Sequence, residues 1–143
     1  MCKGVKMKIR KLNKNDYDQY LPLINNLRDT YFSRIIFEEL FDIINTNSTI
    51  WVIEEDEKLI GTGTILYEYK FIRDISKCAH IEDVCIKEDY RGKNYGTLLI
   101  DHLITEAQNN NCYKIILDCN SELEKFYAKS GLIKSGIQMA LYF

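Results

Sequence analysis

The residues best suited to bind a charged ligand form a basic turn, RGKNYG at positions 91–96, between a predicted strand and a predicted helix. A helix N-terminus carries backbone N–H groups without intrahelical partners, and its dipole favours anions. Gly92 and Gly96 would let the backbone approach a ligand closely, and Arg91 and Lys93 add positive charge. The pattern indicates a pyrophosphate site. The alternative is an ordinary turn with solvated basic side chains, because short glycine motifs often match by chance.

Two adjacent carboxylates, Glu82 and Asp83, lie inside the predicted strand 79–87, which is otherwise largely apolar. Neighbours in a regular strand point to opposite faces of the sheet, whereas a β-bulge would let both serve one site. The alternative is a pair of solvated carboxylates. We favour a functional role, because an apolar strand is expected to lie in the middle of the sheet.

The elements that must position these residues follow the order strand, two helices, three strands, helix, strand, helix, strand. Alternation or apolar runs predict strands, and helical spacing of apolar residues predicts helices. The predicted strands are 5–12, 49–55, 59–69, 79–87, 113–119 and 137–143, and the later helices are 33–45, 97–109 and 121–129. Asn13 and Asn15 can cap the first helix, which Pro22 should kink or delay. We expect one α+β domain over residues 1–143, with helices around a mixed sheet.

Composition excludes several classes of protein. The chain has 143 residues, 46% of them hydrophobic, and a net charge of −2, which argues against disorder and against a global field for nucleic acid or acidic membranes. Five cysteines without a C-x-x-C pair argue against a metal site and a disulfide framework: Cys2, Cys78, Cys85, Cys112 and Cys119. With no apolar leader and no run of roughly 20 apolar residues, a cytoplasmic location is expected.

The turn 91–96 resembles the pyrophosphate loop of the GNAT superfamily of acyl-CoA-dependent N-acyltransferases, Q/R-x-x-G-x-G/A, with one offset. Gly96 falls in place, and Asn94 stands where the first glycine is usual. The blocks HIEDVCI, LLIDHL, CYKIILDC and KFYAKSGL are similar, within that superfamily, to the glucosamine 6-phosphate N-acetyltransferases. The resemblance implies the GNAT fold, a mostly antiparallel sheet with a splayed parallel strand pair. It also implies acetyl transfer from acetyl-CoA to an amino-sugar phosphate, a step of UDP-GlcNAc biosynthesis, without a metal.

The resemblance also assigns catalytic and cofactor-binding residues. It implies that Glu82 and Asp83 orient or deprotonate the amine, that Asp118 contacts the sugar or amine, and that Tyr127 protonates the leaving thiolate. Without the resemblance, Tyr127 would be interpreted as a core aromatic residue. Backbone groups of one strand and the following loop would hold acetyl-CoA: Val84, Cys85, Ile86, Arg91, Gly92, Lys93, Asn94, Tyr95, Gly96 and Thr97. The side chains of Cys85 and Cys119 are expected to be small buried packing groups.

Further residues are implied contacts of the sugar phosphate: Lys70, Phe71, Ile72, Arg73, Tyr113 and Lys114. Two positions depart from the family pattern, because Tyr142 replaces an arginine and Leu123 replaces an asparagine that contacts the cofactor. Arg28 or Arg73 is a candidate for the missing positive charge. A homodimer is implied, with residues 137–143 near the interface. The alternatives are an acetyltransferase for another small amine or a protein N-terminus, and a non-catalytic CoA-binding module.

Overall fold

A five-stranded mixed sheet organises the computed structural model, which describes residues 4–143. Residues 1–3, with Cys2, lie outside the described part. The strands follow one another in space as in sequence: β1 (Met7–Lys11), β2 (Ser48–Glu55), β3 (Lys58–Lys70), β4 (Ser76–Ile86) and β5 (Lys114–Ile116). The first four pair antiparallel, and β4 pairs parallel with β5. The predicted mixed, mostly antiparallel sheet with one parallel pair is therefore confirmed.

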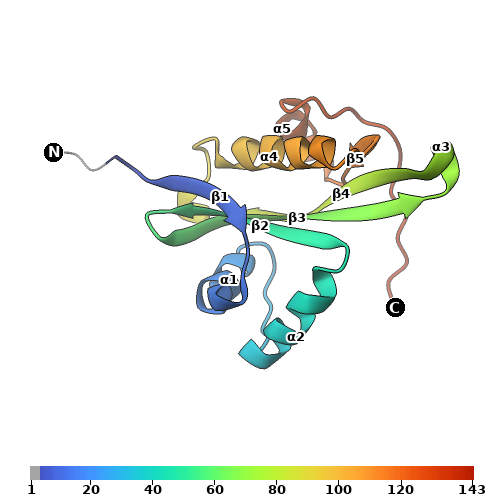
Figure 1. The fold of residues 1–143 in the computed structure, drawn as a ribbon. Coiled ribbons are helices and arrows are strands. Elements are labelled where there is room, and N and C mark those ends of the chain that lie inside the picture. The colour runs from blue at the N-terminus through green and yellow to red at the C-terminus, as the bar shows by residue number, and fades with distance from the viewer. Residues whose placement is uncertain (1–3) are drawn as a thin grey trace.

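Helices cover both faces of this sheet. α1 (Tyr17–Ile24) and α2 (Arg34–Ile44) lie on one side, and α4 (Tyr95–Asn109) and α5 (Glu124–Ala128) lie on the other (Figure 1). The remaining elements are short: the turns η1 (Lys14–Asp16), η2 (Glu88–Tyr90) and η3 (Ser121–Leu123), and α3 (Ile72–Ile75). Apart from the short α3 and the three turns, the order of elements agrees with the sequence up to α5, and the arrangement is three-layered.

The protein has two hydrophobic clusters, one on each face of the sheet, because the central strands are buried on both faces. In β2, Ile50 and Val52 pack toward α1 and α2, whereas Trp51 and Ile53 pack toward α4. This explains why β2 is an apolar run without polar alternation. The predicted ends of α2 are confirmed, because Ser33 caps its first turn by accepting the N–H of Ile36.

Pro22 does not delay the first helix, since α1 starts at Tyr17 and continues through Pro22 to Ile24. This proline lies in the last turn of α1, so few helical hydrogen bonds follow it. The predicted strands 113–119 and 137–143 differ more strongly from the structure.

The sheet ends earlier on the carboxyl side than the sequence predicts. β5 has three residues instead of the predicted 113–119, because its chain diverges from β4 after Ile116. The predicted strand 137–143 is wrong for the single chain, where residues 132–143 have no regular structure. This segment runs from α5 past the sheet edge, and Ile137 is 91% exposed (Figure 1). A strand needs a neighbour for its N–H and C=O groups, and the short β5 offers none along this segment.

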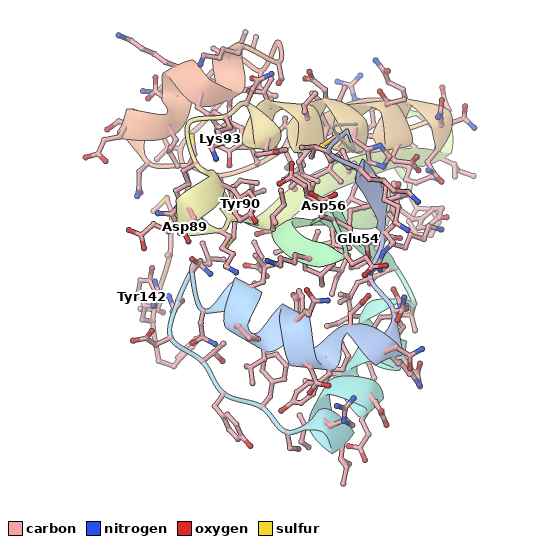
Figure 2. The ribbon with its side chains drawn as sticks, turned by 90° about the vertical axis from the view of Figure 1, so that its left-hand side faces the viewer. Glu54, Asp56, Asp89, Tyr90, Lys93 and Tyr142 are labelled. Carbon is pink, nitrogen blue, oxygen red and sulfur yellow. The ribbon has the colours of Figure 1, made fainter. Side chains whose placement is uncertain are left out.

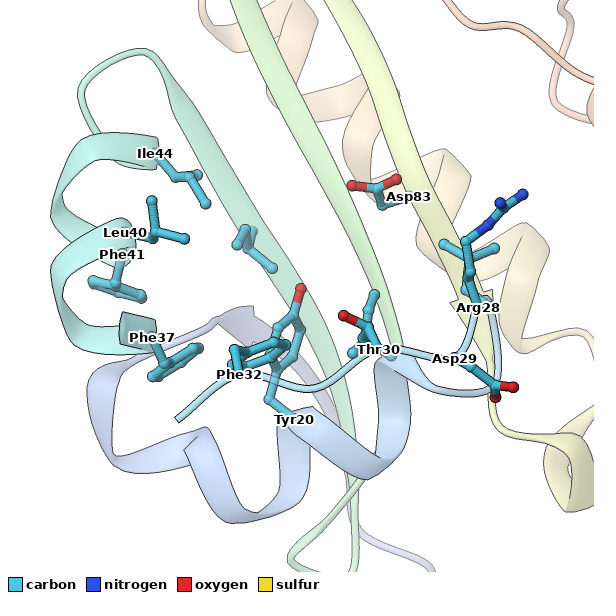
Figure 3. A pocket seen from close by; sticks show the side chains of 13 residues that line it. Tyr20, Arg28, Asp29, Thr30, Phe32, Phe37, Leu40, Phe41, Ile44 and Asp83 are labelled. Carbon is cyan, nitrogen blue, oxygen red and sulfur yellow. The ribbon is translucent and has the colours of Figure 1, made fainter. Parts of the chain in front are cut away.

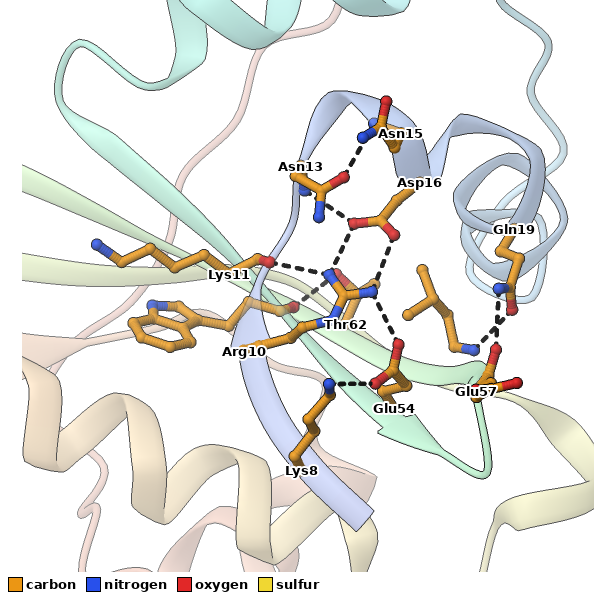
Figure 4. A network of polar contacts seen from close by, with 12 residues as sticks. Lys8, Arg10, Lys11, Asn13, Asn15, Asp16, Gln19, Glu54, Glu57 and Thr62 are labelled. Carbon is orange, nitrogen blue, oxygen red and sulfur yellow. Dashed lines mark hydrogen bonds and ion pairs between the residues drawn. The ribbon is translucent and has the colours of Figure 1, made fainter. Parts of the chain in front are cut away.

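A buried ion pair joins the first strand to the first helical turn (Figure 4). Arg10 donates to both carboxylate oxygens of Asp16, at 2.8 and 2.9 Å, and to Glu54 at 3.0 Å. The backbone N–H of Asn13 also donates to Asp16, at 2.8 Å. Burial alone would raise the pKa of Asp16, but the hydrogen bonds from Arg10 and Asn13 outweigh it, and the pKa is lowered.

We expect Asp16→Asn to lower the free energy of unfolding at pH 7 by about 2 kcal/mol, because Arg10 would lose its bidentate partner. The matched control is Asp42→Asn, which breaks an exposed pair with Lys14 and should cost less than about 1 kcal/mol. Urea unfolding at pH 7 and at pH 3 measures both. Because the pKa of Asp16 is lowered in the folded state, its ionised form stabilises the fold at pH values above the unfolded pKa. This stabilisation is lost as the pH falls through the folded pKa, so the effect of Asp16→Asn on the free energy of unfolding should be smaller at pH 3. Equal losses in the two variants at pH 7 would contradict this role.

Candidate active site

A cavity of about 300 Å³ opens where β4 and the chain that follows β5 diverge. β4 contributes Glu82, Asp83 and Val84, the segment after β5 contributes Asp118, and α5 contributes Tyr127. The splay between two parallel strands thus brings together the four side chains to which the resemblance assigns catalytic roles.

A β-bulge explains how Glu82 and Asp83 reach the same cavity. In the ladder between β3 and β4, Thr64 pairs with Glu82 and Thr62 pairs with Cys85, so two residues of β4 lie opposite Gly63 alone. Asp83 is one of these two, and its φ of +50° is in the left-handed region. The bulge that the adjacent carboxylates suggested is therefore present in the structure.

Gly63 leaves room for α4 under this bulge. A Cβ at Gly63 would lie 3.2 Å from Leu103 Cδ1 and 3.3 Å from Leu99 Cδ2, both in fully buried side chains of α4. The close approach at this glycine comes from side chains of a helix and not from another backbone. The helix supports the strand where the carboxylates leave the regular pleat.

The electrostatics of the cavity favour a proton acceptor at Glu82. Its pKa is raised, first by burial and then by the negative charges of Asp83 and Asp118. Within residues 4–143, none of the ion pairs involves any of these three carboxylates. A carboxylate with a raised pKa is a stronger base, closer to what proton transfer near neutral pH requires.

Tyr127 also lines the cavity. It is buried in the core beside α4, and its ring packs edge-on against Phe126 with the ring centroids 4.8 Å apart. Burial raises its pKa, with a smaller contribution from Cys119. A tyrosine with a raised pKa stays protonated at neutral pH, so the hydroxyl retains a proton that it can give to a leaving group.

The turn 91–96 lies at the N-terminus of α4 (Figure 2). Gly92 and Asn94 adopt positive φ, and the Asn94 side chain does not cap the helix, so the first N–H groups of α4 have no intrahelical or capping partner. The Lys93 ammonium lies 5.6 Å from the centroid of the Tyr90 ring. These features fit a phosphate-binding helix start.

Three other loop residues have structural contacts that the sequence did not reveal. Arg91 Nε donates to the carbonyl of Ile86 at 3.0 Å, which ties the loop to the end of β4. The Tyr95 hydroxyl donates to Glu55. A Cβ at Gly96 would lie 2.8 Å from Phe126 Cζ, so the missing side chain makes room for α5.

Four of the residues expected to contact the sugar phosphate lie at the far tip of the β3–β4 hairpin, and Tyr113 and Lys114 lie next to them at the start of β5. Arg28 lies apart from these residues and lines a cavity beside α1. The Arg73 guanidinium lies 4.7 Å, and the Lys114 ammonium 5.4 Å, from the centroid of the Tyr113 ring. Lys70 pairs with Glu68 at 2.6 Å, and Phe71 and Ile72 are exposed beside them. The ladder places Lys70 opposite Ser76, six residues before Glu82, which is about 20 Å along the strand. The tip of a chain therefore does not reach that chain's own cavity.

Sequence reasoning missed some lining residues and misjudged one cysteine. Leu117, Asn120 and Gln138 also line the cavity, and only the divergence of the chain after β5 brings them there. Cys119 is exposed rather than buried, because it lies beyond the point where its chain leaves the sheet. Cys85 is buried as expected, with its thiol 3.4 Å from the carbonyl oxygen of Leu23.

Residues 4–143 contain no group of three or more histidine, cysteine, aspartate or glutamate side chains that could hold a metal ion. No helix within these residues has the length and apolar character needed to cross a membrane.

Known proteins share both the sequence and the fold. Residues 10–132 match the model of the acetyltransferase (GNAT) family. The chain is 37% identical to glucosamine 6-phosphate N-acetyltransferase 1 of Dictyostelium discoideum, over 93% of this chain and 88% of that one, and 37% identical to the Arabidopsis thaliana enzyme of that name, over 95% and 96%. The crystal structure of glucosamine-6-phosphate N-acetyltransferase from Arabidopsis thaliana superposes with a TM-score of 0.92 at 36% identity, covering 96% of this chain and 99% of that chain.

Proposed function

Because the chain belongs to the acetyltransferase (GNAT) family, we propose that it transfers the acetyl group of acetyl-CoA to the 2-amino group of D-glucosamine 6-phosphate. The observation that carries this proposal is the cavity that joins Glu82, Asp83, Asp118 and Tyr127 at the strand splay. This cavity supplies a base, a buried acid, and carboxylates that can bind an amine. The relatives that bear this name match nearly the whole chain.

The splay also suits the co-substrate acetyl-CoA. β5 pairs only with Cys78, Ala79 and His80 of β4, so the edge of β4 beyond the bulge has no neighbouring strand on that side. The backbone of residues 84–86 is thus available for the amides of the pantetheine chain and for the thioester carbonyl. The loop 91–97 at the start of α4 would hold the pyrophosphate.

The reaction proceeds by direct attack in a ternary complex. The amine loses a proton to Glu82, directly or through water, and its nitrogen forms a bond to the thioester carbonyl carbon. Asp83 and Asp118 hold the amino sugar, and backbone N–H groups near Val84 stabilise the negative charge that develops on the carbonyl oxygen. The carbon–sulfur bond then breaks, and the CoA thiolate takes a proton from Tyr127. No acyl-cysteine is required.

A thiol-release assay with acetyl-CoA tests the proposed acceptor. Glucosamine 6-phosphate, spermidine and a short peptide with a free N-terminus are compared by kcat/KM. The amino sugar phosphate should exceed the other two by about a hundredfold or more, because a polar cavity built for hydroxyl groups rejects acceptors that lack them. A higher value for spermidine or the peptide would overturn the substrate, and absence of thiol release with every acceptor would favour a CoA-binding module.

The proposed active unit is a homodimer. The basic tip with Lys70 and Arg73 starts about 20 Å along β4 from its own cavity, as the ladder spacing requires, so we expect it to serve a phosphate in a second chain. The C-terminal segment supports pairing, because Ile137 and Met139 expose apolar side chains that a second copy would cover. A cytoplasmic location stays a prediction.

Light scattering should report a dimer at micromolar concentration, and deletion of residues 137–143 should convert it into a monomer. The reason is that this segment is apolar and is paired with no strand among residues 4–143 of its own chain. A matched control, Lys134→Ala, breaks an exposed ion pair with Glu124 just before this segment and should leave the mass unchanged. A full-length monomer under these conditions would rule out the proposed assembly.

A further inference from the structure

A second cavity of about 390 Å³ lies on the side of the sheet covered by α1 and α2 (Figure 3). Its walls are apolar and largely aromatic, with Tyr20, Phe32, Phe37 and Phe41 as the aromatic residues. These rings pack on one another at centroid separations of 5.8 to 6.4 Å for the pairs of Tyr20 with Phe37 and Phe32. Of the four side chains assigned to the acetyl transfer, Asp83 is the one that lines this cavity.

The aromatic cavity borders the cavity at the splay. Asp83 and Leu27 line both of them. The bulge at Asp83 produces this arrangement, since the residue leaves the regular alternation of β4. A molecule held in the aromatic cavity would therefore present one end at Asp83, beside the groups proposed to transfer the acetyl.

The charged residues that line this cavity favour a cation. Asp83 and Asp29 supply two carboxylates and Arg28 supplies one guanidinium, so their net charge is negative (Figure 3). In the described residues, Asp83 makes no ion pair and no side-chain hydrogen bond. Tyr20 lies close enough that the negative charge of Asp83, after burial, contributes to raising the pKa of Tyr20 to about 12. Aromatic faces attract an ammonium group, and a carboxylate attracts it more strongly. The end of the cavity at Asp83 thus suits a primary amine.

The walls of the cavity suit an apolar body and not a sugar. Each sugar hydroxyl placed against these rings would lose its hydrogen bonds to water without gaining a partner, which is unfavourable. A dry cavity of roughly 150 Å³ accommodates benzene, so the larger volume here has room for a phenyl ring and a short chain. Glucosamine 6-phosphate therefore belongs in the polar cavity, and the aromatic cavity calls for a different amine.

We propose that the aromatic cavity is a second acceptor subsite, through which the protein also acetylates small arylalkyl amines. The amine lies at Asp83 and the aryl group lies among Phe32, Phe37 and Phe41. The activity rests on the acetyl transfer proposed above. The ammonium gives up a proton, its nitrogen bonds to the thioester carbon, the carbon–sulfur bond breaks, and the thiolate is protonated as the new amide loses its second proton.

The test uses 2-phenylethylamine as the probe, with saturating acetyl-CoA and detection of the released thiol. Leu40→Trp fills the cavity from its mouth, where Leu40 is 47% exposed and a larger side chain can be tolerated. The matched control is Ile36→Trp, one turn earlier on α2, where the side chain is 45% exposed and does not line the cavity. Glucosamine 6-phosphate is assayed with the same preparations.

Leu40→Trp should lower kcat/KM for 2-phenylethylamine about tenfold or more and leave the value for glucosamine 6-phosphate unchanged. Ile36→Trp should change neither value. The subsite is overturned if the wild type acetylates only the sugar, or if Leu40→Trp acetylates both amines normally. If neither amine is acetylated, the proposed function fails, and the subsite is then tested separately by calorimetric binding of 2-phenylethylamine. Binding to the wild type that is lost in Leu40→Trp would support the subsite. Absence of binding to the wild type would overturn it.

Discussion

Replacing Tyr127 with phenylalanine is expected to lower kcat about a hundredfold while the KM for acetyl-CoA stays within about twofold. The substitution removes one hydroxyl group and keeps the ring that packs against Phe126. Because burial raises the pKa of Tyr127, the hydroxyl is protonated at neutral pH and can donate to the departing thiolate. Without it, the thiolate must leave unprotonated or take its proton from water, which slows bond cleavage and not binding.

Tyr67→Phe is the matched control for this experiment. Tyr67 on β3 is also half-buried, and burial raises its pKa to about 12, but its hydroxyl lies away from the strand splay. The same loss of a hydroxyl there should leave kcat near the wild-type value. Steady-state kinetics with varied acetyl-CoA measure both variants. Unchanged turnover in Tyr127→Phe, or an equal decrease in both variants, would remove Tyr127 from the acid role.

Glu82→Gln is expected to lower kcat/KM for glucosamine 6-phosphate about a hundredfold, because the amide cannot accept the proton of the amine. In the wild type, activity should rise with pH as Glu82 ionises. Since the pKa of Glu82 is raised by burial and by neighbouring charges, this rise should lie above the ordinary glutamate value of about 4.3. Glu122→Gln, on an exposed residue of η3, is the control and should behave as wild type.

The pH profile separates a base from a carboxylate that only binds the sugar. Asp83→Asn removes one of the negative charges that raise the pKa of Glu82, so the acidic limb should move to lower pH in this variant, whatever its maximal rate. The ionisation of the free sugar amine is the same for every variant, so a shift between variants reports on the protein. An acidic limb that stays in place in Asp83→Asn and in Glu82→Gln would contradict the assignment of Glu82 as the base.

Local sequence patterns were sufficient to predict much of the fold and the centre of the candidate site. The β2–β3 hairpin, the ends of α2 at Ser33 and Asn45, and α4 follow from alternation, capping and helical spacing. The adjacent carboxylates Glu82 and Asp83 gave a reason to expect the bulge, since a regular pleat would separate them. The resemblance added Asp118 and Tyr127, and the structure places both beside the bulge.

Features that depend on distant partners could not be predicted. Cys119 and the segment 137–143 have apolar or strand-like sequence, but whether they are buried depends on a neighbouring strand that the single chain lacks. The aromatic cavity is a second case. Tyr20, Phe37 and Phe41 have the spacing of ordinary core residues, and only the packing of α1 against α2 leaves a space among them.

The identity of the product tests the central proposal most directly. The protein is incubated with acetyl-CoA and glucosamine 6-phosphate, and the product is examined by NMR spectroscopy while thiol release is recorded. The proposal predicts one acetyl group per thiol released, bound as an amide to the nitrogen at carbon 2. Thiol release without a new amide, acetyl on a sugar oxygen, or no reaction with this amine would contradict it.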